Sequence, residues 1–438
     1  MKTILRLLSA FFVLIVFASC DNTDPINTDT NPFSNGGDER NMIVVISDLH
    51  LGADLDYTEC KENLPSLEKL LKKIKAAPNV KELVIAGDLL DEWFVPATID
   101  TYQGKDQADF VQRIATANKD VIDALNSIIQ EEKILVTYVP GNHDLTITEA
   151  NVELILPGIN QARDPELGLG TYSPVGYPQI AIEHGHRYNF FCAPDPYSNQ
   201  DIAPGTISPP GYFFTRIGAL HVAQGNPPAG DTNPVVTQNT SGDDSQGLLL
   251  TYWSLWNWAI NYLTIENKFD EKIIVTNIDG FTGAYSVNDL LPYQTTAGGL
   301  IDVYLYKGIQ DTWNQRQVHN RVAVYIPTYR AIAWSASESE LSEQAKIQYF
   351  LNPDSDVRLV VFGHTHVPKI ETSTNHQGLK TIYANSGTWI DHNTLDSTKM
   401  NFVVITPQSI DASSQTHVKL YKFNDEVVTL MDENALRL

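Results

Sequence analysis

Cysteine and basic side chains are scarce in this sequence. The 438 residues include three cysteines, Cys20, Cys60 and Cys192, and none lies in the polar motifs described below, so a thiolate metal site is not expected. Lysine and arginine number 30 against 53 aspartate and glutamate residues, which gives a net charge of −23. A nucleic-acid polymer is therefore not an expected partner, because the chain has no excess of basic side chains to replace the counterions of the phosphates.

A long apolar run that could enter a membrane occurs only at the N-terminus. Lys2 and Arg6 form a basic region, and Leu7–Ala18 is an apolar segment too short to span a bilayer comfortably. Phe17-Ala-Ser-Cys20 follows and resembles a bacterial lipoprotein cleavage box. Residues 1–20 are therefore interpreted as a signal peptide with Cys20 as the lipidated residue; a plain signal peptide or an anchored helix are the alternatives.

The next twenty residues, 21–40, are polar and nearly free of large apolar side chains. Such a segment cannot bury enough apolar surface to fold, so it is predicted to be a flexible tether. The rest of the chain would then hang from a membrane through the lipid. These features predict an exported bacterial lipoprotein, in the periplasm or on the outer membrane or cell surface.

Five runs of β-forming residues are each followed by a polar motif. The runs are Ile43–Ile46, Leu83–Ile85, Ile134–Val139, Ile180–Ile182 and Leu359–Phe362. The motifs are Asp48-Leu-His50, Gly87-Asp88, Gly141-Asn-His-Asp144, His184-Gly-His186 and Gly363-His-Thr-His366. Because α/β sheets collect functional side chains at the carboxyl ends of their strands, we expect these motifs to meet.

Two helices are predicted between the first three of these strands, over Leu64–Lys75 and Phe110–Gln130. The resulting order of strand, helix, strand, helix, strand places the motifs along one rim of a sheet. The aspartate, histidine and asparagine ligands suit Mn, Fe, Zn or Ni. Seven such ligands are too many for one ion and about right for two, which predicts a two-metal site.

The ordered motifs resemble the five-block signature of the calcineurin-like metallophosphoesterases, over Asn41–Cys192 and Gln344–Ile405. The resemblance implies an α/β fold, a four-layer αββα sandwich with a large inserted subdomain of helices and loops. The implied domain ranges are a first core part at 41–195, the insertion or cap at 196–343 and a second core part at 344–438.

Two segments look most like one branch of that family, the UDP-diacylglucosamine hydrolases. They are Gly87-Asp-Leu-Leu-Asp-Glu-Trp93 and Asn385-Ser-Gly-Thr-Trp389. That branch usually carries arginine where this chain has His143, and the histidine is the pattern of the broader family.

By this resemblance, seven residues hold two divalent transition-metal ions, Mn, Fe, Zn or Ni. Asp48, His50 and His366 would hold one ion, and Asn142, His184 and His364 the other. Asp88 would bridge them. A hydroxide that both ions share is then expected to attack phosphorus.

His143 is expected to protonate the leaving group or stabilise charge on the phosphoryl group, with Asp144 orienting its ring. Three further residues are less specific. His186 could reach the substrate or a metal-bound water, or support a ligand by a hydrogen bond. Asp91 and Trp93 could shape the pocket wall, although a tryptophan in a loop is more commonly buried.

Gly247–Ile265 is an uncharged, aromatic segment inside the proposed insertion. A membrane-spanning helix is excluded by its length and by the internal Asn257 and Asn261. Two alternatives stay open, a core helix of the insertion and a substrate lid that would suit an amphiphilic substrate. Pairing of Cys60 with Cys192 also stays open.

Together these observations predict an exported, metal-dependent hydrolase of phosphate esters, acting on a phosphodiester, a phosphomonoester or a diphosphate. Its partners would be a small phosphorylated substrate and the membrane that holds the lipid anchor. The alternative is a non-catalytic metal-binding or scaffold lipoprotein that keeps the phosphoesterase fold.

Overall fold

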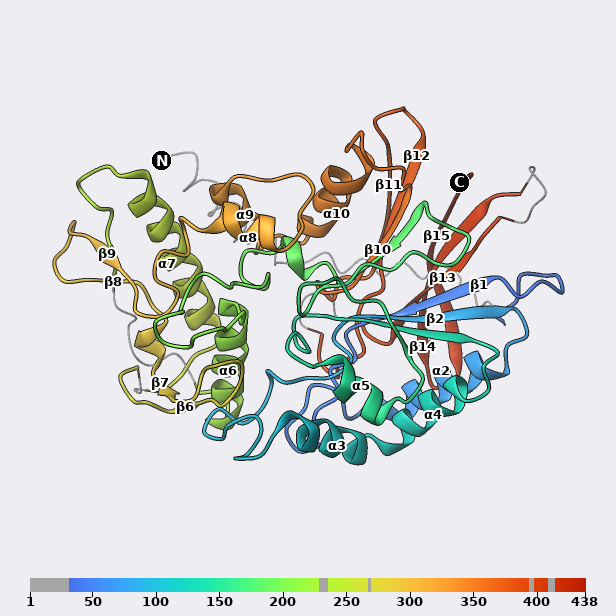
Figure 1. Cartoon of the computed structure of the whole chain (residues 1–438), viewed down its shortest axis with the longest axis horizontal. Coiled ribbons are helices and arrows are strands. Elements are labelled where there is room, and N and C mark those ends of the chain that lie inside the picture. The colour runs from blue at the N-terminus through green and yellow to red at the C-terminus, as the bar shows by residue number, and fades with distance from the viewer. Residues whose placement is uncertain (1–30, 228–234, 267–268, 394–397, 409–413) are drawn as a thin grey trace, which may run out of the picture.

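The structure is a computed structural model that describes residues 31–227, 235–266, 269–393, 398–408 and 414–438 (Figure 1). The predicted signal peptide, its Cys20 and residues 21–30 of the predicted tether lie outside the described residues. Within the described residues, no helix has both the length and the apolar character needed to cross a membrane.

A seven-stranded mixed sheet carries the first three motifs. In spatial order its strands are β15 (Val427–Leu436), β14 (Thr416–Asn424), β13 (Asn401–Thr406), β1 (Met42–Ile46), β2 (Val80–Ala86), β3 (Leu135–Val139) and β4 (Asn160–Gln161). Strands β1 to β4 run parallel, and β13 pairs antiparallel to β1. The parallel run brings the carboxyl ends of β1, β2 and β3 to one edge of the sheet.

A four-stranded sheet carries the other two motifs. Its strands are, in order, β11 (Lys369–Thr374), β12 (Lys380–Asn385), β10 (Leu359–Phe362) and β5 (Ile180–Ile182). Strands β5, β10 and β12 are parallel. One face of this sheet packs on the larger sheet through buried aliphatic side chains such as Val45, Val84, Ile182 and Val361. The five predicted strands are thus confirmed in two sheets, which face each other.

Helices cover the outer face of each sheet, which confirms the predicted αββα sandwich. The larger sheet is covered by α2 (Leu64–Ala76), α3 (Gln107–Ala117), α4 (Lys119–Ile129) and α5 (Glu149–Ile155). The smaller sheet is covered by α10 (Glu340–Ala345) and the π-helical turn η4 (Lys346–Phe350). Buried apolar side chains fill all three spaces between these layers.

The predicted helix over Phe110–Gln130 is wrong in one respect, since the segment forms two helices, α3 and α4. Asn118 separates them, and its side-chain amide donates to the carbonyls of Gly52 and Ile114. An asparagine that satisfies carbonyls in this way ends the first helix and lets the chain turn. The predicted first helix, Leu64–Lys75, is confirmed as α2 with Pro65 in its first turn.

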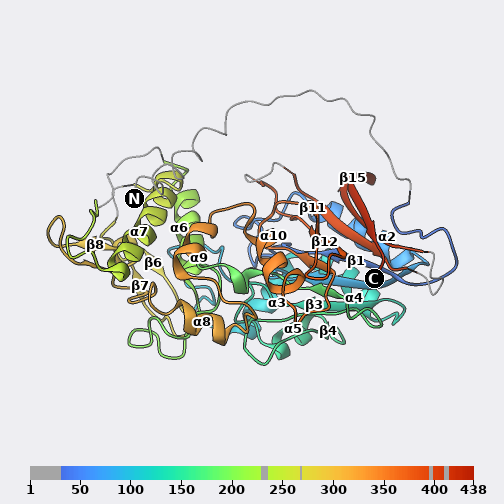
Figure 2. The same cartoon turned by 90° about the horizontal axis from the view of Figure 1, so that it is seen from above.

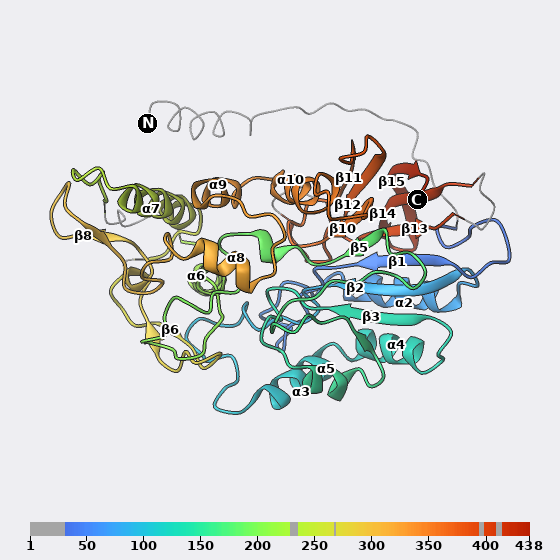
Figure 3. The ribbon, with the colours of Figure 1, turned by 45° about the horizontal axis from the view of Figure 1, so that its top comes forward.

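The chain between η2 (His186–Tyr188) and α10 builds a second hydrophobic core of its own. The elements of this part are α6 (Pro210–Ala223), α7 (Asp244–Tyr262), β6 (Ile274–Val275), β7 (Ala284–Tyr285), η3 (Val287–Asp289), β8 (Tyr293–Gln294), β9 (Ile301–Asp302), α8 (Trp313–His319) and α9 (Thr328–Trp334). Figures 2 and 3 show α6, α7 and the short strands β6 and β8 to one side of the sheets. The boundaries at 196 and 343 stay predictions.

Helix α7 is the aromatic segment for which the sequence left two interpretations. Leu249, Tyr252, Trp256 and Ile260 are buried in the insertion core. Trp258 is 52% exposed on the opposite side. The helix is therefore a core element of the insertion, with one aromatic edge at the surface.

Cys60 and Cys192 are both free thiols. Cys60 lies buried in the core beneath the larger sheet, and Cys192 lies beside Gly211 at the start of the insertion. Burial raises the pKa of both thiols, so neither has the character of a reactive thiolate.

Candidate metal centre

The five motifs meet at the carboxyl ends of their strands, where the backbone takes an unusual shape. Asp48, His50, Asp88, His364 and His366 all have left-handed backbone angles, with φ between 46° and 68°. Non-glycine residues adopt this region at an energetic cost, and they do so most often at functional sites. The sharp turns that result let one motif supply two side chains to the site, as Asp48 with His50 and His364 with His366 do.

Three motif glycines leave the room that the ligand side chains occupy. A Cβ on Gly87 would lie 2.4 Å from the ring of His184, and one on Gly141 would lie 2.1 Å from the Asp88 carboxylate. A Cβ on Gly363 would lie 2.6 Å from the carboxylate of Asp48. Glycine precedes the ligands in these motifs because the neighbouring ligand passes directly over its backbone.

Two carboxylates form the middle of the site. Asp48 and Asp88 are buried, and Asp48 Oδ1 lies 3.2 Å from His366 Nε2. Asp88 Oδ2 lies 3.1 Å from His184 Nε2 and 3.7 Å from His50 Nε2. Asp88 is therefore the carboxylate that touches a histidine on each side of the site.

The hydrogen bonding of His184 tests whether these residues suit a cation. Its Nδ1 lies 2.9 Å from the carbonyl oxygen of Ala86, so Nδ1–H donates there and Nε2 is the nitrogen that would bind a cation. That Nε2 faces Asn142 Oδ1 at 3.0 Å and Asp88 Oδ2 at 3.1 Å. An Nε2 without a proton would join these two oxygens as a third ligand atom for a cation, and a histidine whose Nδ1–H is fixed by a backbone carbonyl is typical of a metal ligand.

The other side of the site has the same character. His50 Nε2 and His366 Nε2 lie 3.3 Å apart, and both face Asp48. His50 Nδ1 lies 3.1 Å from Glu59, so His50 also presents its second nitrogen to the site. The residues Asp48, His50 and His366 therefore fit a metal ion, as do Asp48, Asp88 and His184.

His364 lies beside His184. The centroids of the two rings lie 5.1 Å apart, and the backbone N–H of His364 donates to Asp48. Burial, with His184 beside it, lowers the pKa of His364 to about 3. A neutral imidazole at physiological pH is the form that binds a metal.

The paired charges keep the two carboxylates ionised in spite of their burial. Burial alone would raise the pKa of Asp88, but the neighbouring His184 and His143 hold it well below its usual range. In the same way His184 and His366 lower the pKa of Asp48. The site therefore presents two carboxylates to an incoming cation.

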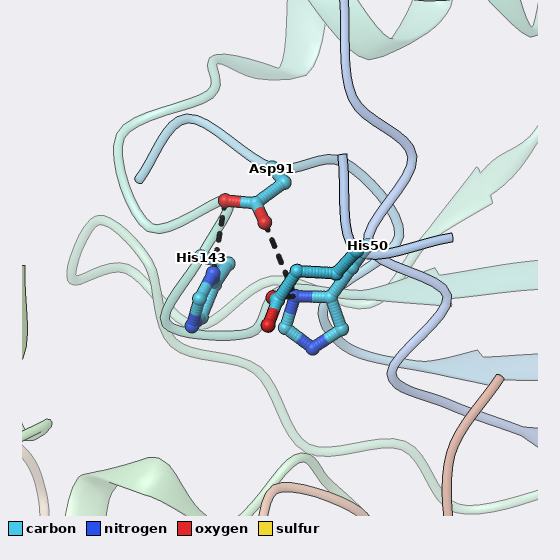
Figure 4. Close-up of side chains that lie close together, drawn as sticks. His50, Asp91 and His143 are labelled. Atoms are coloured by element: carbon cyan, nitrogen blue, oxygen red, sulfur yellow. Dashed lines mark hydrogen bonds and ion pairs between the residues drawn. The ribbon is translucent and has the colours of Figure 1, made fainter. Parts of the chain in front are cut away.

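His143 lies at the edge of the centre and is paired with Asp91 (Figure 4). Its Nδ1 lies 2.9 Å from Asp91 Oδ1, and its backbone N–H donates to Asp88 Oδ1 at 2.8 Å. The indole of Trp93 packs on the same ring, with centroids 4.8 Å apart. Burial lowers the pKa of His143, but the Asp91 and Asp88 carboxylates more than offset this and raise it.

The expected pairing of Asp144 with His143 is wrong. The Asp144 carboxylate accepts hydrogen bonds from the backbone N–H groups of Gly141, Leu89 and Leu90, and so ties the turns after β2 and β3 together. It points into the core because those unpaired N–H groups lie there. Asp91, which the sequence placed at the pocket wall, takes the role assigned to Asp144.

His186 lies behind the ligands. Its ring centroid is 5.3 Å from that of His184 and 6.5 Å from that of His364, and the residue is 2% exposed. Neither of its nitrogens has a partner among the described residues. Burial and the nearby histidines lower its pKa well below the usual value, so it is a neutral ring beside the centre.

The sequence did not single out Glu59 or Asn393. Glu59 contacts His50 from a loop with other acidic residues, and nothing in its local pattern distinguishes it. Asn393 donates to the carbonyl of His366, and Asn385 donates to that of Gly363. These two amides hold the loop that carries His364 and His366 in its left-handed turns.

Comparison with known proteins agrees with this site. Residues 42–207 match the family of calcineurin-like phosphoesterases. That range contains Asp48, His50, Asp88, Asn142 and His184, and the structure brings His364 and His366 to them from outside it. No curated protein matches the sequence.

Solved structures with some likeness include two forms of Vps29 from Entamoeba histolytica and a nuclease. The single mutant of Vps29 has 11% identity and a TM-score of 0.29, and the double mutant 10% and 0.30; each covers 90% of this chain and 99% of its own. The nuclease MPE of Pseudomonas putida has 16% identity and a TM-score of 0.20, covering 35% of this chain and 56% of its own. These TM-scores are too low to support a statement about the fold or the function of this chain. The family match and the converging motifs identify residues 42–207 as a calcineurin-like phosphoesterase domain.

Proposed function

We propose that this protein hydrolyses phosphate esters at a centre of two divalent metal ions. The observation that carries the proposal is the position of Asp88. One of its oxygens lies 3.1 Å from His184 Nε2 and 3.7 Å from His50 Nε2, and the other accepts the backbone N–H of His143. A single carboxylate thus joins two groups of metal ligands to a histidine that can transfer a proton.

The ligand groups divide around that carboxylate. Asp48, His50 and His366 would hold one ion, Asn142, His184 and His364 the other, and Asp88 both. When bound, such ions activate water and neutralise the charge that develops on a phosphoryl group. The mixed nitrogen and oxygen donors favour Mn, Fe, Zn or Ni over Mg or Ca.

His143 would protonate the oxygen of the leaving group. Asp91 occupies its Nδ1, so Nε2 is the nitrogen that can give a proton to a substrate. Asp91 is itself held by the backbone N–H groups of Trp93 and Phe94. The carboxylate therefore fixes both the tautomer and the direction of the ring, while Trp93 packs against its face.

The substrate we propose is a small phosphorylated molecule outside the cytoplasm, as a phosphomonoester, a phosphodiester or a diphosphate. A UDP-sugar lipid would fit the branch resemblance, but nucleotide precursors of that kind are cytoplasmic. The proposed export therefore favours an ester that occurs outside the cytoplasm. The charge of −23 supports a small substrate over a nucleic-acid polymer.

We also propose attachment to a membrane through a lipid on Cys20. The support is the basic Lys2 and Arg6, the apolar segment Leu7–Ala18 and the cleavage box that ends in Cys20. Cys20→Ser should move the protein from the membrane fraction to the soluble extract. A variant that stays in the membrane would exclude the anchor.

The enzymatic proposal is tested with a panel of phosphomonoesters, phosphodiesters and nucleotide diphosphates, assayed with added Mn²⁺. The wild-type chain and His376→Ala, an exposed histidine away from the motifs, should turn over the same substrate, and Asp88→Ala should not. Metal binding without turnover on any member of the panel would support the non-catalytic scaffold instead.

A further inference from the structure

A second group of metal-type side chains lies directly behind His143. His50, Glu59, Asp91 and His143 each offer one ligand atom, and these four atoms lie within 4.8 Å of one another. The individual contacts are 3.1 Å from His50 Nδ1 to Glu59, 3.4 Å from the same nitrogen to Asp91, and 2.9 Å from Asp91 to His143 Nδ1.

Two carboxylates converge in this group. The Nδ1–H of His50 is the one proton donor that both carboxylates share, and Asp91 also accepts from His143 Nδ1 and from two backbone N–H groups. Two anions this close repel each other unless a positive charge lies between them.

The group is also open to ions from solution. The side chain of Glu59 is 26% exposed and that of His143 is 13% exposed, whereas Asp91 is 1% exposed. An ion can therefore reach the carboxylates from the side of Glu59. The fixed Asp91 would form the rear of the site.

We propose that Glu59, Asp91 and His143 form a third, inhibitory site for a divalent cation of the zinc type. This inference rests on the proposed two-ion function. His50 serves the main centre through Nε2 and keeps its Nδ1 proton, so it is a neighbour of the third ion and not a ligand. Two carboxylates and one imidazole match the charge of a divalent ion and the ligand preference of Zn²⁺.

Occupation of this site would switch off proton transfer. The cation takes the lone pair of His143 Nδ1, and the proton on that nitrogen is released to solvent. The hydrogen bond from His143 to Asp91 is then replaced by coordination of both groups. With Nδ1 coordinated, the ring holds one proton and not the two of the acid form, and it loses the hydrogen bond to Asp91 that directs it, so it no longer serves as the proton donor to the leaving group.

The test is a titration of the metal-free full chain with Zn²⁺. Calorimetry measures the binding of each equivalent, and the rate of hydrolysis of an alkyl phosphate ester is measured at each point. We expect two tight equivalents that raise the rate, then a third, weaker equivalent that lowers it by about tenfold or more, as loss of a general acid does. Excess Mg²⁺ added to the two-ion enzyme should not lower the rate, because Mg²⁺ prefers oxygen ligands and the inhibition requires coordination of the His143 nitrogen.

Glu59→Gln is the deciding variant, because glutamine can still accept the hydrogen bond of His50 but carries no charge. It should lose the third equivalent and the inhibition and keep the first two equivalents. Asp56→Asn, a carboxylate on the same loop whose side chain is 92% exposed, should keep all three.

Three results would overturn the inference. They are a wild-type titration that ends at two ions without inhibition, a third equivalent that persists in Glu59→Gln, and the loss of one of the first two ions in that variant. Failure to bind any ion would instead reject the proposed function.

Discussion

His143 Nδ1 lies 2.9 Å from Asp91 Oδ1, although 52 residues separate them in the sequence. His143→Ala should lower turnover by about 10²–10⁴-fold for an alkyl phosphate, because the leaving oxygen loses its proton donor. Asp91→Asn should lower it less, since an amide oxygen can still accept the Nδ1–H but carries no charge.

The leaving group separates proton donation from other roles. The losses of turnover in His143→Ala and Asp91→Asn should both be smaller for nitrophenyl phosphate, because its leaving group needs no proton. The metal content of both variants should stay near normal. His376→Ala is the control. An equal loss on both substrates would mean that His143 stabilises the phosphoryl group instead.

Gly87→Ala should displace His184. Its Cβ would meet the ring at 2.4 Å, and its φ of +89° is also unfavourable for alanine. Gly104→Ala is the matched control, because φ is +73° there and no atom lies within 4 Å of the new Cβ. The control should lose about 1 kcal/mol of stability and no metal.

The variant at Gly87 should lose more stability than that control and should also lose metal from the His184 side. Thermal unfolding and elemental analysis of both proteins measure the difference. Equal behaviour of the two variants would show that the ring of His184 is free to move aside.

Helix α7 should behave as a core element of the insertion. Trp256 is 1% exposed and touches the rings of Phe191 and Phe214, so Trp256→Ala should cost about 3–5 kcal/mol. Trp258 is 52% exposed on the same helix, so Trp258→Ala should change the free energy of unfolding by about 0.5 kcal/mol or less.

Urea unfolding of the two variants gives these values. KM for a bulky and for a small substrate should change together in Trp256→Ala. A rise in KM confined to the bulky substrate, with unchanged stability, would favour the lid interpretation instead.

Glu340 should make stability depend on pH. Burial raises its pKa to about 8 from an ordinary value of 4.5, and the one described partner of the carboxylate is the side-chain amide of Asn189. Between these two values the folded chain holds a proton that the unfolded chain has lost. The contribution of Glu340 to the free energy of unfolding is therefore complete below about pH 4.5. It falls as pH rises toward 8, by about 1.4 kcal/mol per pH unit at most.

Glu340→Gln should flatten this part of the profile, because the amide does not ionise and can still accept from Asn189. Glu338→Gln, at an exposed neighbouring position, should not. Unfolding midpoints in urea from pH 5 to 8 provide the measurement. Parallel profiles for the wild-type chain and Glu340→Gln would rule out a protonated Glu340.

Much of the fold and of the metal centre follows from local sequence pattern. A short apolar strand followed by a small residue and a polar residue is a local feature, and Ile43–Ile46 with Asp48 or Leu359–Phe362 with His364 show it plainly. The parallel order of strands then brings the motifs together without further information. The seven residues that we propose as metal ligands are singled out in this way, and their ligand roles stay predictions.

Features that depend on the direction of a side chain cannot be predicted from local sequence pattern. Asp144 follows His143 directly, but a turn sends neighbouring side chains in different directions, and the backbone N–H groups that attract Asp144 lie on the core side. No local sequence pattern marks Glu59, because its contact with His50 depends on the conformation of the loop that carries Glu59. The hairpin of β14 and β15 was missed as well, since it lies beyond the last motif.

The most direct test of the account is the metal content of the full chain after loading with Mn²⁺ or Zn²⁺ and dialysis to remove weakly bound ions. The wild-type protein should retain two ions per chain, and Asp88→Ala should retain close to none, because Asp88 lies between both ligand groups. Asp56→Asn should retain two. A wild-type protein without metal, or an Asp88→Ala variant that keeps two ions and its full rate, would contradict the account.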